Sequence, residues 1–226
     1  MMEPEHQQLT RSQLEEQLQA ALREQERLRR DTHHRIRNNL QIIASLLDLQ
    51  AYAAQHPQVE AALANTQQRL QALARIHDCV AQTDEGGQVH VAVYLEKLHQ
   101  CLCEPYSPDA ADITVRLHAD PIRLPVRRAI TCGLLLQELL SNCFQHAFPI
   151  GQTGEIVIAL RAQPDNMAAL IVRDNGIGLP AHVDFQDTES VGSQLISILT
   201  EELEGTLTLA REAGTTITVR FPVQTL

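Results

Sequence analysis

The chain has 226 residues, which is enough for two small domains, and its formal net charge is -10. This acidic balance argues against a nucleic-acid-binding protein, because a phosphate backbone is held mainly by lysine and arginine. Apolar runs such as residues 129–136 are much shorter than the ~20 residues that cross a bilayer, and the N-terminus does not resemble a signal peptide. We therefore expect a cytoplasmic protein with no membrane span and no nucleic-acid partner.

One very long helix is expected over residues 8–55, which contain no proline or glycine and are rich in good helix formers. Apolar residues recur on it at spacings of three and four, with a shift of about one residue near residues 29–32. The positions on this seam are Leu14, Leu18, Ala21 and Leu28, followed by His33, Ile36, Leu40, Ile43 and Leu47. We expect residues 1–30 to be a helical extension, acting as a signal helix or coiled coil.

A second helix should follow the break at His56-Pro57, because proline cannot continue a helix and restricts the residue before it. Its 3.5-residue period is carried by Val59, Leu63, Thr66, Leu70, Leu73, His77 and Val80. Two adjacent seams joined by a proline turn predict an antiparallel hairpin over residues 31–87, with residues 84–87 as a short linker. Because a hairpin hides only one face, we expect two copies to form a homodimeric four-helix bundle.

Residues 88–226 mix helical and strand patterns and predict a separate domain. Helices are expected over residues 91–102, 126–147 and 191–203, and strands over residues 113–119, 155–161, 168–174, 206–209 and 216–221. Strands in pairs beside several helices indicate an α/β sandwich with a mixed sheet. The fold class expected for the chain is therefore α plus α/β.

A polar stripe marks the helix that ends near residue 147. Glu138, Asn142 and His146 are spaced by fours, so they project from one helical face, while leucines cover the other side. A carboxylate, an amide and an imidazole together could hold a hydrated metal ion and phosphate oxygens. An ordinary amphipathic surface explains the stripe equally well.

Glycines flank two further elements of the C-terminal half. Asp174 ends a strand and is followed by Gly176 and Gly178, which would let the backbone pass close to a ligand while the aspartate accepts a hydrogen bond from an adenine amino group. Gly192 opens a helix, where backbone amides suit an anion such as a triphosphate. The Asn-Gly pair could instead be a simple hairpin turn, and neither a P-loop nor a GxGxxG motif is present.

Taken in order, these segments resemble the four boxes of the GHKL (Bergerat) ATPase fold, the superfamily of histidine kinases, gyrase, Hsp90 and MutL. The boxes are Glu138-x-x-x-Asn142, Asp174-x-Gly176-x-Gly178, the Gly192 segment, and Gly214-Thr215 before the last strand. The resemblance implies that residues 88–226 are a catalytic ATP-binding domain using ATP and Mg²⁺. Asn142 and Glu138 would lie at the metal, Asp174 at the adenine, and His146, Gly176, Gly178, Gly192 and Thr215 at the nucleotide.

The N-terminal half narrows the resemblance to bacterial two-component sensor histidine kinases. The segment His34-Arg35-Ile36-Arg37-Asn38-Asn39 is similar to the H-R-x-x-N-N acceptor box of a branch related to the HWE type. Residues 31–87 would then be the dimerisation and phosphotransfer hairpin. His33 falls on the helical seam, whereas His34 lies about 100° away from it, so we expect His34 to accept the phosphoryl group.

Two positions depart from the usual histidine-kinase pattern. Arg35 stands where many kinases place an acid to orient the histidine, and we expect Asp31, three residues before His34, to take that role. Glu138 is the other candidate acid. Gln145 replaces a lysine usual in this branch, which removes one cation from the phosphate end of the site.

The resemblance implies autophosphorylation of His34 by ATP and transfer to an aspartate of a response-regulator receiver domain. The input would come from a separate sensor protein or from a missing N-terminal sensor domain. Alternatives are a histidine phosphotransferase that no longer binds ATP, a GHKL ATPase clamp, and a serine kinase of the anti-sigma type. The intact Asp174, Gly176 and Gly178 oppose the first, His34 in its box opposes the second, and the acceptor hairpin opposes the third.

Overall fold

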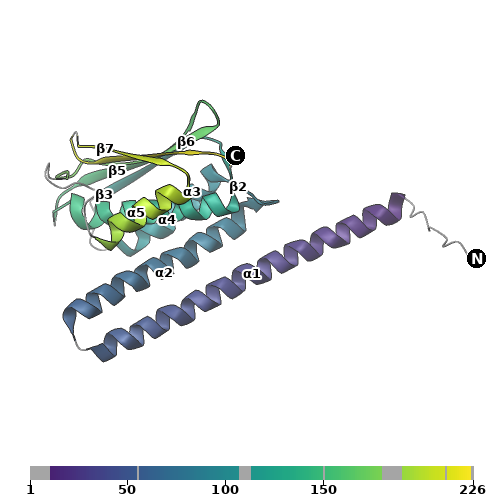
Figure 1. The fold of residues 1–226 in the computed structure, drawn as a ribbon, viewed down its shortest axis with the longest axis horizontal. Helices are drawn as coiled ribbons and strands as arrows, with labels where there is room; N and C mark the ends of the chain where they lie inside the picture. The colour runs from purple at the N-terminus through teal and green to yellow at the C-terminus, as the bar shows by residue number, and fades with distance from the viewer. Residues whose placement is uncertain are drawn as a thin grey trace, which may run out of the picture.

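The computed structural model describes residues 11–54, 56–106, 113–149, 151–179, 190–211 and 213–224. Two long antiparallel helices form the N-terminal hairpin, α1 (Arg11–Ala54) and α2 (Pro57–Thr83), and α1 continues well beyond the end of α2 toward the N-terminus (Figure 1). Pro57 occupies the first turn of α2, where its fixed φ and missing N–H fit a helix start. The expected long helix and its break at His56-Pro57 are confirmed.

Side chains from both helices meet along the hairpin. The rings of His33 and His77 lie with their centroids 6.1 Å apart. Arg37, one turn after His33 on α1, forms an ion pair with Asp78 of α2. The expectation that His33 and His77 face the hairpin seam is confirmed. The backbone of Leu14 and His34 is helical, but the side chains of both lie outside the described residues.

A small three-stranded sheet follows α2 in place of the expected linker. It joins β1 (Asp84–Glu85), β2 (Gln88–His90) and β4 (Arg123–Pro125), all antiparallel. Gly86 and Gly87 form the two-residue turn between β1 and β2 with φ of 66° and 89°. Positive φ at both central positions is the requirement of a type I′ hairpin turn, so the two glycines close a hairpin there.

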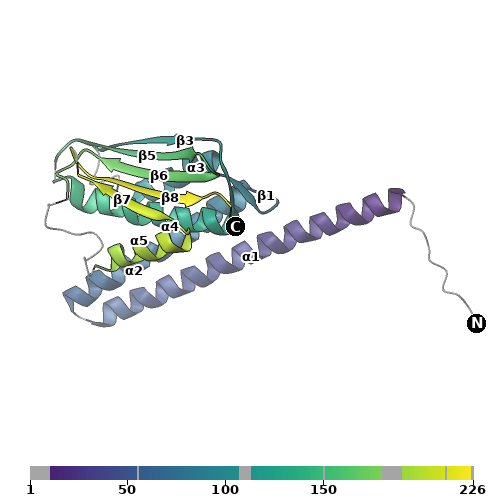
Figure 2. The ribbon, with the colours of Figure 1, turned by 45° about the horizontal axis from the view of Figure 1, so that its top comes forward.

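The C-terminal half is a two-layer sandwich, with three helices on one face of a five-stranded sheet (Figure 2). The sheet order is β3 (Ile113–Ala119), β5 (Gly154–Gln163), β6 (Met167–Asp174), β8 (Thr216–Pro222), β7 (Thr206–Ala210). Only β3 and β5 pair in parallel, so the sheet is mixed as expected. The covering helices are α3 (Val91–Cys103), α4 (Val126–Asn142) and α5 (Val191–Glu202).

Two short helical segments extend this plan. A 3-10 turn, η1 (Glu104–Tyr106), follows α3, and a π-helical turn, η2 (Cys143–Ala147), follows α4. The expected helix over residues 126–147 is therefore regular only to Asn142. Wider π turns occur mostly as single turns near functional sites, and this one carries His146.

Aliphatic side chains build the core, as expected for a chain with 3% aromatic residues and no tryptophan. The core is shared between the hairpin and the sandwich: Ile76 and Val80 of α2 are fully buried in one cluster with Leu95 and Leu98 of α3 and Leu135 of α4. The C-terminal third of α2 is thus packed against the sandwich, which fixes the hairpin beside it in this conformation.

Candidate functional site

The polar stripe on α4 lies where the helix meets the sheet edge and α2. Glu138 is buried, Asn142 is half-buried at the last residue of α4, and His146 is exposed on η2. The apolar side of the same helix, with Leu135 and Leu139, packs into the core. The stripe is therefore directed away from the core and toward two adjoining cavities.

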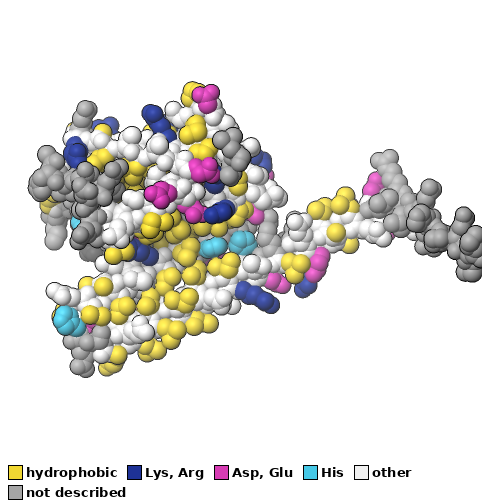
Figure 3. Space-filling view, in the orientation of Figure 1, with side chains coloured by type: hydrophobic (Ala, Val, Ile, Leu, Met, Phe, Trp, Pro, Cys, Tyr) yellow, Lys and Arg dark blue, Asp and Glu magenta, His cyan; other side chains and the backbone are white. Residues whose placement is uncertain are grey.

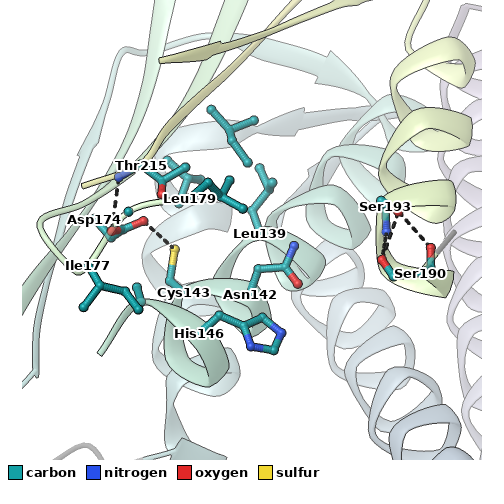
Figure 4. Close-up of a pocket in the computed structure, with 14 residues that line it drawn as sticks. Leu139, Asn142, Cys143, His146, Asp174, Ile177, Leu179, Ser190, Ser193 and Thr215 are labelled. Atoms are coloured by element: carbon teal, nitrogen blue, oxygen red, sulfur yellow. Dashed lines mark hydrogen bonds between the residues drawn. The ribbon is translucent and has the colours of Figure 1, made fainter. Parts of the chain in front are cut away.

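Asp174, at the end of β6, is held by the backbone around it (Figure 4). Its Oδ1 accepts hydrogen bonds from the Gly176 amide at 2.9 Å and the Thr215 amide at 3.2 Å. Its own amide donates to the Thr215 carbonyl at 2.9 Å, which ties the end of β6 to the start of β8. Backbone amides, and no charged side chain among these contacts, thus fix the orientation of the carboxylate.

Cys143 lies on the other side of the Asp174 carboxylate, with its Sγ 3.9 Å from Oδ2. Burial raises the pKa of the Cys143 thiol well above its usual range, and the nearby Asp174 adds to the rise. The thiol therefore stays protonated and can act as a weak donor, while Oδ2 remains an acceptor at the cavity wall.

Two glycines allow the chain segments around Asp174 to approach closely. A Cβ atom on Gly176 would clash with the Ala147 carbonyl oxygen, to which the Ile177 amide donates at 2.9 Å. Gly214 has a φ of 110°, and a Cβ atom there would clash with the Asp174 carbonyl oxygen. Only glycine satisfies both the space and the backbone angle at position 214.

The first cavity has a volume of about 380 Å³ and is mostly apolar. In Figure 4 Asp174 and Thr215 lie on one side and Ser190 and Ser193, at the start of α5, on the other, with Asn142 and His146 between them. The apolar walls come from Leu139, Ala147, Val172, Ile177, Leu179 and Ile217. A largely apolar cavity with one fixed acceptor suits a purine ring that carries an amino group.

A second cavity of about 360 Å³ adjoins the first and shares Asn142, His146 and Ser190 with it. Its lining is polar and comes from α2, α4, η2 and the start of α5. Ser190 caps α5, with its Oγ accepting from the Ser193 amide at 3.2 Å, so the helix begins at the junction of the two cavities. A helix N-terminus of this kind favours an anion.

Arg69 of α2 was not singled out from the sequence, yet it lines this second cavity. Its Nε and Nη2 donate to Oε1 and Oε2 of Glu138 at 2.8 and 2.9 Å, a bidentate pair that joins the hairpin to α4. No sequence spacing relates residues 69 and 138. Only the packing of α2 on α4 brings them together.

The expected acceptor residues are not among the described residues that line the two cavities. Asp31 is exposed on α1, and the His34 side chain is outside the described residues. Residues 180–189, which precede the Gly192 segment, are likewise outside them. The structure thus gathers Glu138, Asn142, His146, Asp174, Gly178, Gly192 and Thr215 at the two cavities, with Gly176 supporting Asp174.

Two family models match the chain. Residues 31–106 match the model described as histidine kinase, and residues 127–225 match the histidine kinase-, DNA gyrase B- and HSP90-like ATPase model. The chain belongs to the histidine kinases. The sequence resemblance is therefore confirmed for both halves, as is the GHKL-type ATPase fold of the second half.

Sensor histidine kinases are also among the similar proteins. The chain is 30% identical over 198 residues to the sensor histidine kinase PdtaS of Mycobacterium tuberculosis, covering 86% of this chain and 39% of that protein. It is 24% identical over 201 residues to blue-light-activated histidine kinase 2 of Erythrobacter litoralis, covering 85% of this chain and 56% of that protein. The histidine kinase chain described here thus spans about two fifths to just over half the length of these relatives.

Solved structures show the same kinase fold. The histidine kinase domain of the Erythrobacter litoralis EL346 blue-light-activated kinase superposes with a TM-score of 0.63 at 24% identity, covering 88% of this chain and 93% of that one. The likeness shows that this chain has the same fold of hairpin and sandwich. Within the described ranges, no helix of this histidine kinase is long and apolar enough to span a bilayer.

Proposed function

We propose that this histidine kinase binds ATP in the two adjoining cavities and transfers its γ-phosphoryl group to His34. The observation that carries the proposal is the fixed Asp174 acceptor in a mostly apolar cavity that opens into a polar one at Asn142. The adenine would lie beside Asp174 and Thr215. The phosphates would then extend past Asn142 and His146 to the start of α5.

The side chains at the polar cavity fit Mg²⁺. A Cβ atom on Gly192 would lie 3.6 Å from Glu138 Oε2 and 3.8 Å from Asn142 Oδ1, so both oxygens face the same small space. Oxygen donors of this type suit Mg²⁺, which keeps several waters and binds through one or two protein groups together with phosphates. When bound, Mg²⁺ would neutralise phosphate charge, with Asn142 and Glu138 as its protein contacts.

The transfer itself needs a neutral imidazole as nucleophile. A His34 ring nitrogen would attack the γ-phosphorus in line with the departing oxygen, forming a P–N bond as the bond to that oxygen breaks and ADP leaves. Asp31, three residues earlier on α1, would accept a hydrogen bond from the other ring nitrogen and hold the ring. Positioning, more than covalent assistance, would supply the rate enhancement.

The observed conformation precedes transfer. The contacts of His33 with His77 and of Arg37 with Asp78 place the acceptor segment of α1 beside the C-terminal part of α2. Arg69, at the polar cavity, precedes His77 by eight residues, or about 12 Å of helix at ~1.5 Å per residue. Reacting atoms must approach to roughly 3 Å, so we propose that the ATP-binding domain shifts along the hairpin before transfer to His34.

The exposed apolar residues of the hairpin support a homodimer. Figure 3 shows hydrophobic side chains gathered along both helices, and those on the C-terminal part of α1 include Ile42, Leu46 and Leu49. A second hairpin would bury them in a four-helix bundle. The phosphoryl group would then pass to a receiver-domain aspartate of a response regulator, with the stimulus supplied by a sensor domain or a sensor protein.

Incubation with γ-labelled ATP and Mg²⁺ tests the proposed chemistry. Wild type should acquire acid-labile, alkali-stable label, which His34→Gln and Asn142→Ala should abolish and His33→Gln should retain. Label that survives His34→Gln would overturn the choice of acceptor. If wild type bound ATP without acquiring label, the ATPase clamp would explain the fold better; if it bound none, the phosphotransferase would.

A further inference from the structure

The nucleotide cavities contain little positive charge for a triphosphate. Among the described residues that line either cavity, Arg69 is the one arginine or lysine, and it comes from the hairpin. The sequence of residues 180–189, just before the Gly192 segment, contains no lysine or arginine and includes two aspartates and a glutamate. Gln145, which also lines the second cavity, adds no charge either.

The position of Arg69 brings its guanidinium to the phosphate end of the site. A Cβ atom on Gly192 would lie 3.6 Å from Arg69 Nη2, which places the guanidinium opposite the first turn of α5. The pair with Glu138 engages Nε and Nη2 of Arg69. The Nη1 amino group carries two further donors that can reach a phosphate oxygen, because guanidinium presents its five N–H groups as a planar fork.

Neighbouring contacts fix this part of α2 against the site. Gln68 donates through Nε2 to the Tyr106 hydroxyl at 2.7 Å, and the Tyr106 ring stacks on Phe144 with centroids 4.5 Å apart and planes 9° from parallel. Phe144 belongs to η2, the turn between Asn142 and His146. Gln68 is therefore linked to η2 through Tyr106, while Arg69 contacts α4 directly, and these two consecutive residues hold α2 against the nucleotide site.

We propose that Arg69 is a nucleotide-binding residue of this kinase, which the hairpin contributes to the ATP site and which contacts the terminal phosphates. The inference rests on the proposed binding of ATP and extends it. Glu138 keeps the guanidinium in place before ATP arrives, and binding of a triphosphate gives the arginine a second anionic partner. Because α2 carries Arg69, the ATP-loaded site holds its full charge only while the domain is docked on the hairpin.

Calorimetric titration of the intact chain with Mg²⁺ and a β,γ-imido analogue of ATP, or with AMP, tests this role. Arg69→Ala should weaken binding of the triphosphate analogue by about tenfold to a hundredfold, the range expected when a charged hydrogen bond is lost. Its affinity for AMP should equal that of wild type, because the adenine cavity is untouched. Arg69→Gln, which keeps a donor toward Glu138, should show the same selective loss and serves if Arg69→Ala does not fold.

A second variant separates direct contact from simple neutralisation of Glu138. Because Glu138 is also a proposed Mg²⁺ contact, Glu138→Gln alone is the reference for this variant. If Arg69 touches the phosphates, Arg69→Ala/Glu138→Gln should bind the triphosphate more weakly than Glu138→Gln does. Equal affinities of Glu138→Gln and the double variant, or an Arg69→Ala affinity equal to wild type, would overturn the proposal while leaving ATP binding intact. Arg127→Ala, which removes an exposed arginine paired with Glu202, is the matched control and should bind normally. Failure of wild type to bind either nucleotide would overturn the proposed function together with this inference.

Discussion

Asp174 and Thr215 are joined by two hydrogen bonds: the Asp174 amide donates to the Thr215 carbonyl, and the Thr215 amide donates to Asp174 Oδ1. With the Gly176 amide also bound to Oδ1, the rotation of the carboxylate is fixed. Oδ2 is left as the oxygen that a ligand in the apolar cavity can use. The identity of the atom at that position therefore determines what the cavity accepts.

The substitution Asp174→Asn should remove the preference for an amino-substituted purine. The two backbone amides require an oxygen at the Oδ1 position, so the new amide group must turn its NH₂ toward the ligand and oppose the adenine amino group. We expect the free energy of ATP binding to become less favourable by about 1–3 kcal/mol, the cost of an unsatisfied buried polar group.

Competition between ATP and purine riboside triphosphate, which lacks the amino group, measures this effect. Wild type should favour ATP and Asp174→Asn should not. A variant that still favoured ATP by the wild-type factor would show that Asp174 does not read the amino group.

Gly192 and Gly176 should respond differently to alanine. At Gly192 the nearest atoms to an added Cβ lie 3.6 Å away, so Gly192→Ala should fold normally, but its methyl group would occupy space between Arg69, Glu138 and Asn142. At Gly176 the added atom meets the Ala147 backbone, which cannot move aside like a flexible side chain.

Thermal unfolding and nucleotide titration distinguish the two variants. Gly192→Ala should keep the wild-type Tm and AMP affinity but bind ATP several-fold more weakly. Gly176→Ala should lose about 1–3 kcal/mol of stability and weaken both nucleotides, because it displaces the turn that holds Asp174. Equal affinities of Gly192→Ala and wild type for ATP would place the phosphates elsewhere.

The sequence predicted the site residues better than the contacts between them. Asp174 ends β6, Gly178 lies shortly after it, and Thr215 directly precedes β8, so turn chemistry and box order indicated that these residues would lie at the nucleotide cavity. The prediction of a linker at residues 84–87 was wrong because Gly86 and Gly87 suit a hairpin turn as well as a flexible connection. The strand β4, which pairs with β2, lies far along the chain, so the sequence near residue 87 does not reveal it. Arg69 was missed for a related reason: its role depends on how α2 packs on α4, which no local pattern encodes.

Acidification should weaken the hairpin through His77. Burial lowers the pKa of His77, and the nearby His33 ring lowers it further. A histidine whose pKa is depressed in the folded state contributes stability that is present above its unfolded value of about 6.5 and is lost as pH falls below it. The free energy of unfolding in urea should therefore decrease from pH 7.5 to pH 5.5.

A comparison of two histidine variants isolates this contribution. His77→Gln should reduce the difference in unfolding free energy between the two pH values, whereas His118→Gln, at an exposed position on β3, should leave it unchanged. An identical pH dependence in His77→Gln and wild type would assign the effect to other groups.

The hairpin surface should hold two copies of the kinase together. Ile42 and Leu46 are 60% and 54% exposed and lie one turn apart on α1, beside Leu49. Burial of such side chains stabilises by about 1.5–3 kcal/mol each relative to exposure, whereas a lysine at the same position would bring a charge into an apolar interface. Light scattering should give a dimer mass for wild type and a monomer mass for Ile42→Lys/Leu46→Lys. Ile198→Lys, which alters an equally exposed apolar residue on α5, should remain dimeric, and a wild type that is monomeric at micromolar concentration would rule out this face as a stable dimer interface.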